Sequence, residues 1–192
     1  MVSGEPTFVD ETRSAIILFD MLSSELIKSS YSDDCFVILV SPWVKDYAIP
    51  PVWPSFSSNF FSIKNMQKIS DIIKKLCENN VHITLLTKSK SHLESEKHPE
   101  WSIPGSIEFH DTIQKYGVKI CYHADNHAKH AVTSGTTFIT SANITHTGLG
   151  GMQGNTGSYG TKKDFPNWYK ESLDWCIGKI KESENPDVYF SK

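Results

Sequence analysis

Two basic residues that flank a single alanine are the first candidates for chemistry in this sequence. They are His127 and Lys129, and in a β-strand such alternate side chains project from the same face. An imidazole can attack phosphorus as a nucleophile, and a fixed ammonium group beside it can hold the charge of a phosphodiester. The pair therefore predicts phosphoryl-transfer chemistry.

Short polar side chains follow one strand later. Thr140 and Ser141 carry hydroxyl groups, and Asn143 carries an amide. Such groups can donate further hydrogen bonds to the phosphate that the basic pair would hold. The catalytic residues that we predict are His127, Lys129 and Asn143, with Ser141 and Thr140 as phosphate-binding residues.

The elements that must position these residues alternate along the chain. Helical spacing of apolar residues predicts helices over 12–27, 63–79, 106–116 and 168–181. Continuous apolar runs predict buried strands over 35–40, 81–86 and 118–123, and the later segments 126–133 and 137–141 predict a hairpin. This order favours a layered α/β fold, with a mixed but largely parallel sheet flanked by helices.

Length and composition favour one globular domain over residues 1–192. Polar or glycine-rich stretches predict long loops at about 44–62, 88–104 and 148–166. The net charge of -3 argues against a large non-specific nucleic-acid footprint but allows a local basic groove. Four widely spaced cysteines are typical of reduced thiols. With no signal peptide and no apolar run near ~20 residues, we expect a cytoplasmic protein without membrane contact.

The run from His127 to Leu149 resembles the phospholipase D superfamily, whose signature is H-x-K-x4-D followed by a G-S-x-N-type segment. This sequence keeps the His-x-Lys and the Ser-x-Asn, but it has Ser134 in place of the aspartate and Thr140 in place of the glycine. Asn155 keeps the first residue of the N-x-E element of the family, whose acid is replaced by Gly157. The resemblance adds Ser134 and Asn155 to the expected phosphate-binding residues.

The resemblance also implies a site made of two halves, each with one His, one Lys and one Asn. This chain has one such motif, so the resemblance implies a homodimer across the His127 and Lys129 motif. One copy of His127 would form a phosphohistidine while the other protonates the leaving oxygen, and Lys129 would neutralise the pentacovalent phosphate. No metal ion or other cofactor is expected.

Three functions remain open at this stage. The first is a metal-independent nuclease, which by resemblance to small single-motif bacterial members would belong to a restriction or phage-defence system with partner proteins. The second is a nucleic-acid-binding subunit that has lost catalysis, as Ser134 and Gly157 would allow. The third is a phospholipid hydrolase, although the sequence has no basic amphipathic helix to suggest it.

Two side-chain groups have alternative interpretations. His123, His127 and His130 have metal-ligand spacing, but a strand would turn His130 away from His127, and no Cys or acid completes the set. The aromatic residues at 43, 53, 56, 60 and 61 could stack nucleobases, contact a second subunit or form a satellite core.

Overall fold

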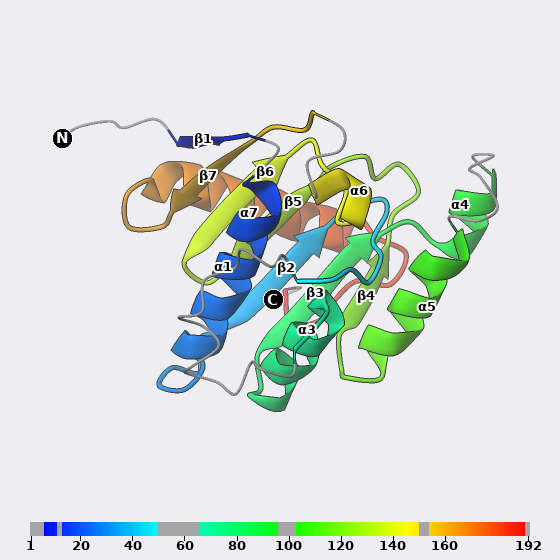
Figure 1. The fold of residues 1–192 in the computed structure, drawn as a ribbon, viewed down its shortest axis with the longest axis horizontal. Helices are drawn as coiled ribbons and strands as arrows, with labels where there is room; N and C mark the ends of the chain where they lie inside the picture. The colour runs from blue at the N-terminus through cyan, green and yellow to red at the C-terminus, as the bar shows by residue number, and fades with distance from the viewer. Residues whose placement is uncertain (1–5, 11–12, 50–65, 96–102, 150–153, 191–192) are drawn as a thin grey trace.

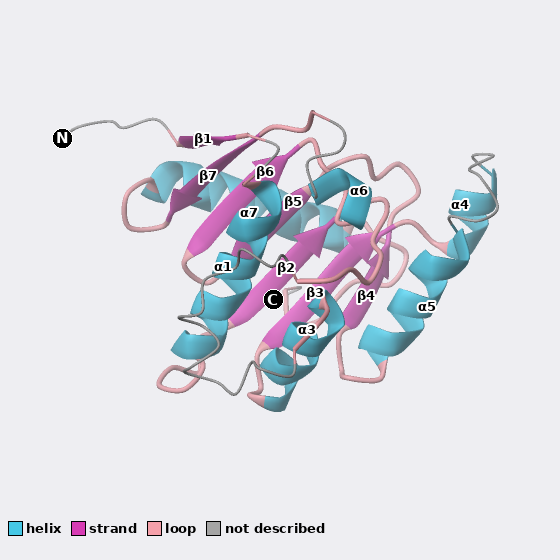
Figure 2. Ribbon diagram, viewed as in Figure 1, coloured by secondary structure: helices cyan, strands magenta, loops and turns pink. Residues whose placement is uncertain are grey.

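The chain forms one seven-stranded sheet that is covered by helices on both faces, as Figure 1 shows for the course of the chain and Figure 2 for its secondary structure. This architecture comes from a computed structural model. The model describes residues 6–10, 13–49, 66–95, 103–149 and 154–190. The layered α/β class predicted from the sequence is confirmed, and the sheet has the order β1-β7-β6-β5-β2-β3-β4.

One half of the sheet is parallel. It is built from β2 (Phe36–Val40), β3 (His82–Thr87) and β4 (Lys119–Tyr122). Helices α3 (Ile69–Glu78) and α5 (Ile103–Gln114) make the connections between them. Parallel neighbours need such long crossovers, and the sequence pattern predicted this half well.

The other half is antiparallel, so the prediction of a largely parallel sheet is wrong in this respect. Its strands are β5 (His130–Thr133), β6 (Thr136–Thr140), β7 (Gly157–Thr161) and β1 (Thr7–Val9). Every pairing from β2 outward through β5, β6, β7 and β1 is antiparallel. The two-residue connection makes β5 and β6 the hairpin that the sequence predicted. The antiparallel pairings of β5 with β2 and of β7 with β1 join segments far apart in the chain, so no local spacing indicates their direction.

Several short elements lie where the sequence predicted loops. The predicted loop at 148–166 overlaps α6 (His146–Leu149) and contains β7, and the one at 88–104 contains α4 (Lys90–Ser95). Of the predicted loop at 44–62, residues 50–62 lie outside the described residues, and 44–49 contain only isolated bridges. The sequence analysis missed the strand β7 because it contains two glycines, and glycine in a sequence usually indicates a turn.

The core lies on both faces of the sheet, because alternate residues of β2 point to opposite sides. Val37 and Leu39 belong to the core beneath α1 (Ser14–Lys28), α3 and α5. Ile38 and Val40 belong to the core beneath α7 (Pro166–Lys181), which covers the other face (Figure 1). Among the described helices, none has both the length and the apolar character that crossing a membrane requires.

Candidate active site

The topology brings three strand ends to one edge of the sheet. Val40 at the end of β2 lies opposite His130 at the start of the antiparallel β5. The end of β6 returns to the same place, where the Thr140 amide donates a hydrogen bond to the Lys129 carbonyl at 3.0 Å. The sequence-predicted residues on either side of the β5–β6 hairpin therefore meet at this edge.

The His-x-Lys segment lies just before β5, which begins at His130, not at residue 126 as expected. Asn126 fixes this segment: its amide donates to the Leu86 carbonyl at 3.2 Å and accepts from the Ala128 amide at 3.1 Å. Its side chain is buried, whereas His127 is exposed at the surface. The sequence analysis missed Asn126, although an Asn directly before the motif is a common turn-forming residue.

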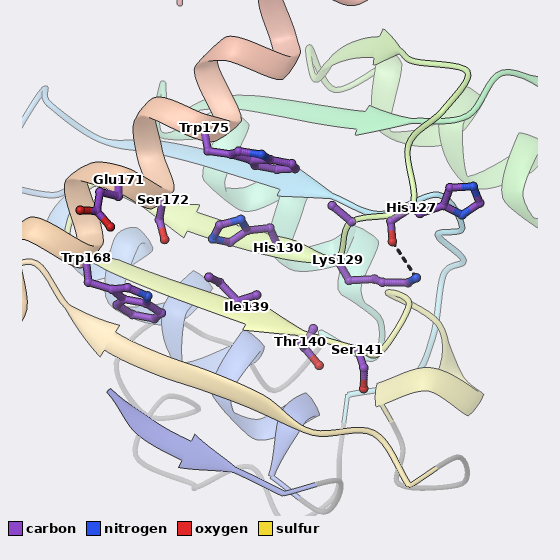
Figure 3. Close-up of a pocket in the computed structure, with 11 residues that line it drawn as sticks. His127, Lys129, His130, Ile139, Thr140, Ser141, Trp168, Glu171, Ser172 and Trp175 are labelled. Carbon is purple, nitrogen blue, oxygen red and sulfur yellow. Dashed lines mark hydrogen bonds between the residues drawn. The ribbon is translucent and has the colours of Figure 1, made fainter. Parts of the chain in front are cut away.

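Lys129 is held beside the main chain of His127. Its ammonium group donates to the His127 carbonyl at 2.7 Å, as Figure 3 shows. Burial, and secondarily the positive charge of Lys88, lower the pKa of Lys129. Lys88 follows β3 directly and is 1% exposed, so a second buried cation lies near the predicted one. The sequence analysis placed Lys88 within a predicted loop. The parallel pairing of β3 with β2 brings Lys88 to the edge of the sheet where Lys129 lies.

The predicted hydroxyl and amide residues form one hydrogen-bonded group. The Ser141 hydroxyl donates to Asn155 Oδ1 at 3.0 Å, and Asn155 Nδ2 donates to the Gly148 carbonyl at 3.0 Å. The Thr140 hydroxyl donates to the carbonyl of Thr156 at 3.1 Å. Three residues predicted to bind phosphate therefore lie together, and Thr140 joins them to the main chain of Lys129.

Asn143 is positioned by the segment that follows β2. The Ser41 hydroxyl accepts from the Ile144 amide at 3.2 Å, and the Ile144 carbonyl accepts from the Lys45 amide at 3.0 Å. Among the described residues, no group bonds the buried Oδ1 of Asn143. A buried amide oxygen without a partner is costly.

Ser134 does not join the others. It lies in the β5–β6 turn, at the opposite end of β5 from Lys129. Its hydroxyl accepts a hydrogen bond from Lys28 Nζ at 2.6 Å. Its placement does not favour the predicted role in phosphate binding; it joins the end of α1 to the hairpin turn.

A cavity of about 520 Å³ opens beside these residues, with one basic and polar end. That end is lined by His127, Lys129, Thr140 and Ser141, and Figure 3 shows the cavity continuing along β5 and β6 to α7. His130, at its floor, is buried and hydrogen-bonded to Thr137 Oγ1 at 3.0 Å.

The alternative of a histidine metal site finds no support in the arrangement of donors. Within the described ranges, no three His, Cys, Asp or Glu side chains are grouped so that they could hold a metal ion. Burial lowers the pKa of His130 to about 4, and its ring contacts Cys176 at 3.6 Å. We therefore assign His130 to the packing between β5 and α7.

A family model described as "Cardiolipin synthase, PLD-like domain" matches residues 55–175. The chain belongs to the phospholipase D superfamily. The match includes the His-x-Lys motif and the Ser-x-Asn segment, and it confirms the family predicted from them. Membership places this phospholipase D-like protein in a superfamily of phosphodiesterases and nucleases.

Solved structures of low sequence identity share the fold. NucT from Helicobacter pylori is 12% identical, with a TM-score of 0.55 over 93% of this chain and 97% of that one. Nuc from Salmonella typhimurium, a phospholipase D family member, is 12% identical, with a TM-score of 0.50 over 84% and 87%. The archaeal chromatin protein TrmBL2 is 10% identical, with a TM-score of 0.51 over 95% and 54%. No curated protein matches the sequence significantly.

Proposed function

We propose that this phospholipase D-like protein is a metal-independent phosphodiesterase that cleaves nucleic acid. The supporting observation is the basic end of the cavity, where Lys129 lies beside His127 and the hydroxyls of Thr140 and Ser141 line the same space. A nucleophile, a cation and neutral hydrogen-bond donors are the groups that phosphoryl transfer needs.

In the proposed reaction, a ring nitrogen of His127 attacks phosphorus, and the bond to the leaving oxygen breaks. A second, protonated imidazole gives its proton to that oxygen. Water then attacks the phosphohistidine, the second imidazole takes the proton of that water, and the bond between histidine and phosphorus breaks. Lys129 neutralises the pentacovalent phosphate, assisted by the amide of Asn143 and by Ser141.

One chain contributes one such half-site, so the proposal includes a homodimer that apposes two copies of the motif. The exposure of His127 agrees with this, because its imidazole is open to a second subunit. The two rings need opposite protonation states, and they would titrate as a coupled pair.

The choice of nucleic acid is supported by membership of a superfamily that includes nucleases and by the fold shared with Nuc, NucT and a chromatin protein that binds DNA. A cytoplasmic role in bacterial defence, with partner proteins, stays part of the proposal. A second candidate is nucleic-acid binding without turnover, which the replacements at Ser134 and Gly157 favour. The same cleavage experiment separates the two.

The test is cleavage of DNA and of bis(p-nitrophenyl) phosphate in the presence of EDTA. We expect turnover by the wild type and its loss in His127→Ala, with His146→Ala, an exposed histidine of α6, as the matched control. Acid-labile phosphate trapped on His127 would identify the intermediate. Inhibition by EDTA contradicts metal independence, and equal inertness of wild type and His127→Ala leaves the binding function.

A further inference from the structure

The far end of the cavity is built from two indole rings. Trp168 and Trp175 stand seven residues apart on α7 and so share one face of that helix. Between them the floor is formed by His130 and Ile139, which are direct partners across β5 and β6. Trp175 and Ile139 are 41% and 40% exposed, which leaves an open aromatic and aliphatic bed beside the phosphate site (Figure 3).

The two ends of this cavity differ in charge. Lys129 contributes a cation at the end near His127, whereas Glu171 contributes an exposed carboxylate between the two tryptophans. Buried His130, whose pKa lies at about 4, adds no positive charge near neutral pH. A phosphate is therefore attracted to one end and repelled from the other, and the carboxylate can accept hydrogen bonds from N–H groups.

We propose that the tryptophan end binds an unstacked nucleobase of single-stranded nucleic acid, whose phosphate lies at Lys129. This rests on the proposed function of the same site. Aromatic side chains stack on the faces of bases whatever the sequence, and a volume of about 520 Å³ is typical of small-molecule pockets. Bases inside a duplex are stacked and paired, so the pocket selects single strands or unpaired ends.

A lipid tail fits this chemistry less well. An acyl chain offers no hydrogen-bond donor to Glu171. It would displace water from this carboxylate and from the buried hydroxyl of Ser172 without replacing the hydrogen bonds of that water. A base has a flat apolar face for the indoles and polar edges for these groups.

The test measures binding separately from cleavage, in the His127→Ala background. The probes are a fluorescein-labelled single-stranded decamer of mixed sequence, a decamer of the same charge made only of abasic sites, and a duplex of the labelled strand. We expect the single strand to bind roughly 5-fold to 100-fold more tightly than the abasic chain, as the stacking of one base predicts. Trp175→Ala should remove most of this difference and leave the abasic affinity unchanged.

Tyr31→Ala is the matched control, since it removes a ring that is 76% exposed and lies outside the cavity. Trp175→Phe keeps an aromatic face and should retain most of the preference for the single strand over the abasic chain. This variant keeps the test decisive if Trp175→Ala does not fold. Equal affinity for the single strand and the abasic chain overturns the base pocket, while the cleavage assay still decides the proposed function. Tighter binding of the duplex, or Trp175-dependent binding to phosphatidylglycerol vesicles, also overturns it.

Discussion

At the scale of single residues, the sequence predicted which candidate residues lie close together where their spacing along one hairpin decides it. Lys129, Thr140 and Ser141 lie at the open end of the β5–β6 hairpin, so strand pairing alone brings them together. Lys88 was missed because it arrives from a strand on the far side of β2. Ser134 was misplaced because a position in a sequence motif does not say at which end of a strand a residue lies.

Asn126 makes a first prediction at this scale. Asn126→Ala removes one hydrogen bond that joins the His-x-Lys segment to Leu86 of β3, and a second that holds the Ala128 amide within the segment. The Leu86 carbonyl keeps the hydrogen bond from the Ser41 amide, and the loss of the two Asn126 bonds should lower the free energy of unfolding by about 1–3 kcal/mol. Urea denaturation measures this loss, and amide hydrogen exchange at Ala128 should become faster than in the wild type.

Asn185→Ala is a matched control for this change. Asn185 makes an equivalent pair of hydrogen bonds, to the Ile120 carbonyl and from the Tyr122 amide of β4. Its loss should cost similar stability while leaving exchange at Ala128 and cleavage close to the wild-type values. Equal effects of both variants on cleavage would mean that Asn126 has no positioning role.

At the scale of elements, long apolar helices and strands were predictable, and short or glycine-rich ones were not. The apolar run of β2 and the periodicity of α3 are strong local signals. The strand β7 has no such signal. Its residues fit against the neighbouring strand β6, and they do not follow a regular alternation of apolar and polar residues. Gly157 shows this most clearly: it pairs with Thr140 in the register of β6 and β7.

A prediction follows for Gly157. An added Cβ would lie 2.5 Å from the Ile139 carbonyl oxygen and 2.6 Å from the Phe138 ring, so main chain and core would both have to shift. We expect Gly157→Ala to lower the free energy of unfolding by roughly 1–3 kcal/mol, measured by urea denaturation. Gly157→Glu should destabilise the fold further and not restore the acid of the family motif. Gly135→Ala, where the added atom meets nothing within 4 Å, is the control.

The segment after α7 is held on the sheet by a buried carboxylate, Asp187. It bonds the hydroxyl of Thr84 and lies 2.6 Å from His82 Nε2, while the Tyr189 ring stacks on the imidazole at 4.0 Å. Burial alone would raise the pKa of Asp187, but hydrogen bonds from Thr84, His82 and the Tyr189 amide outweigh it and lower the pKa.

A pH dependence follows from this lowered pKa. The stabilisation by Asp187 is complete above the unfolded value, near 3.9, and is lost as the pH falls through the lower folded value. Asp187→Asn should lower the free energy of unfolding by roughly 1–3 kcal/mol at pH 7 and flatten its fall between about pH 5 and pH 2. Urea midpoints across this range measure both effects. Asp33→Asn, at an exposed site, should match the wild type.

At the scale of the whole molecule, the fold class, the parallel half and the β5–β6 hairpin could be predicted, but the antiparallel pairing of β5 with β2 and the places of β7 and β1 could not. The alternation of helices and strands up to β4 indicates parallel crossovers. After β4 the chain passes to the other side of β2 and continues in hairpins. Because the chain crosses back in this way, the His-x-Lys motif lies at the edge of the sheet where β2 and β3 end. This crossing also leaves His127 exposed, and the proposed function completes the site with a second molecule.

The requirement for two copies of His127 gives a quantitative prediction for mixed dimers. When wild-type and His127→Ala chains are unfolded together and refolded at varied ratios, random pairing makes the fraction of dimers with two histidines equal to the square of the wild-type fraction. Each active dimer needs one histidine as nucleophile and another as acid, so cleavage should follow that square. An equal mixture should then show about a quarter of the wild-type activity, as independent random pairing requires.

Mixing with His146→Ala chains is the control, and it should leave the activity near that of the wild type at every ratio. Sedimentation of each mixture reports whether dimers form equally well in both series. A linear fall of activity with the His127→Ala fraction would mean that each chain works alone, because every wild-type subunit would then keep its own turnover. That result would contradict the shared site, and one chain alone would then have to perform both proton transfers.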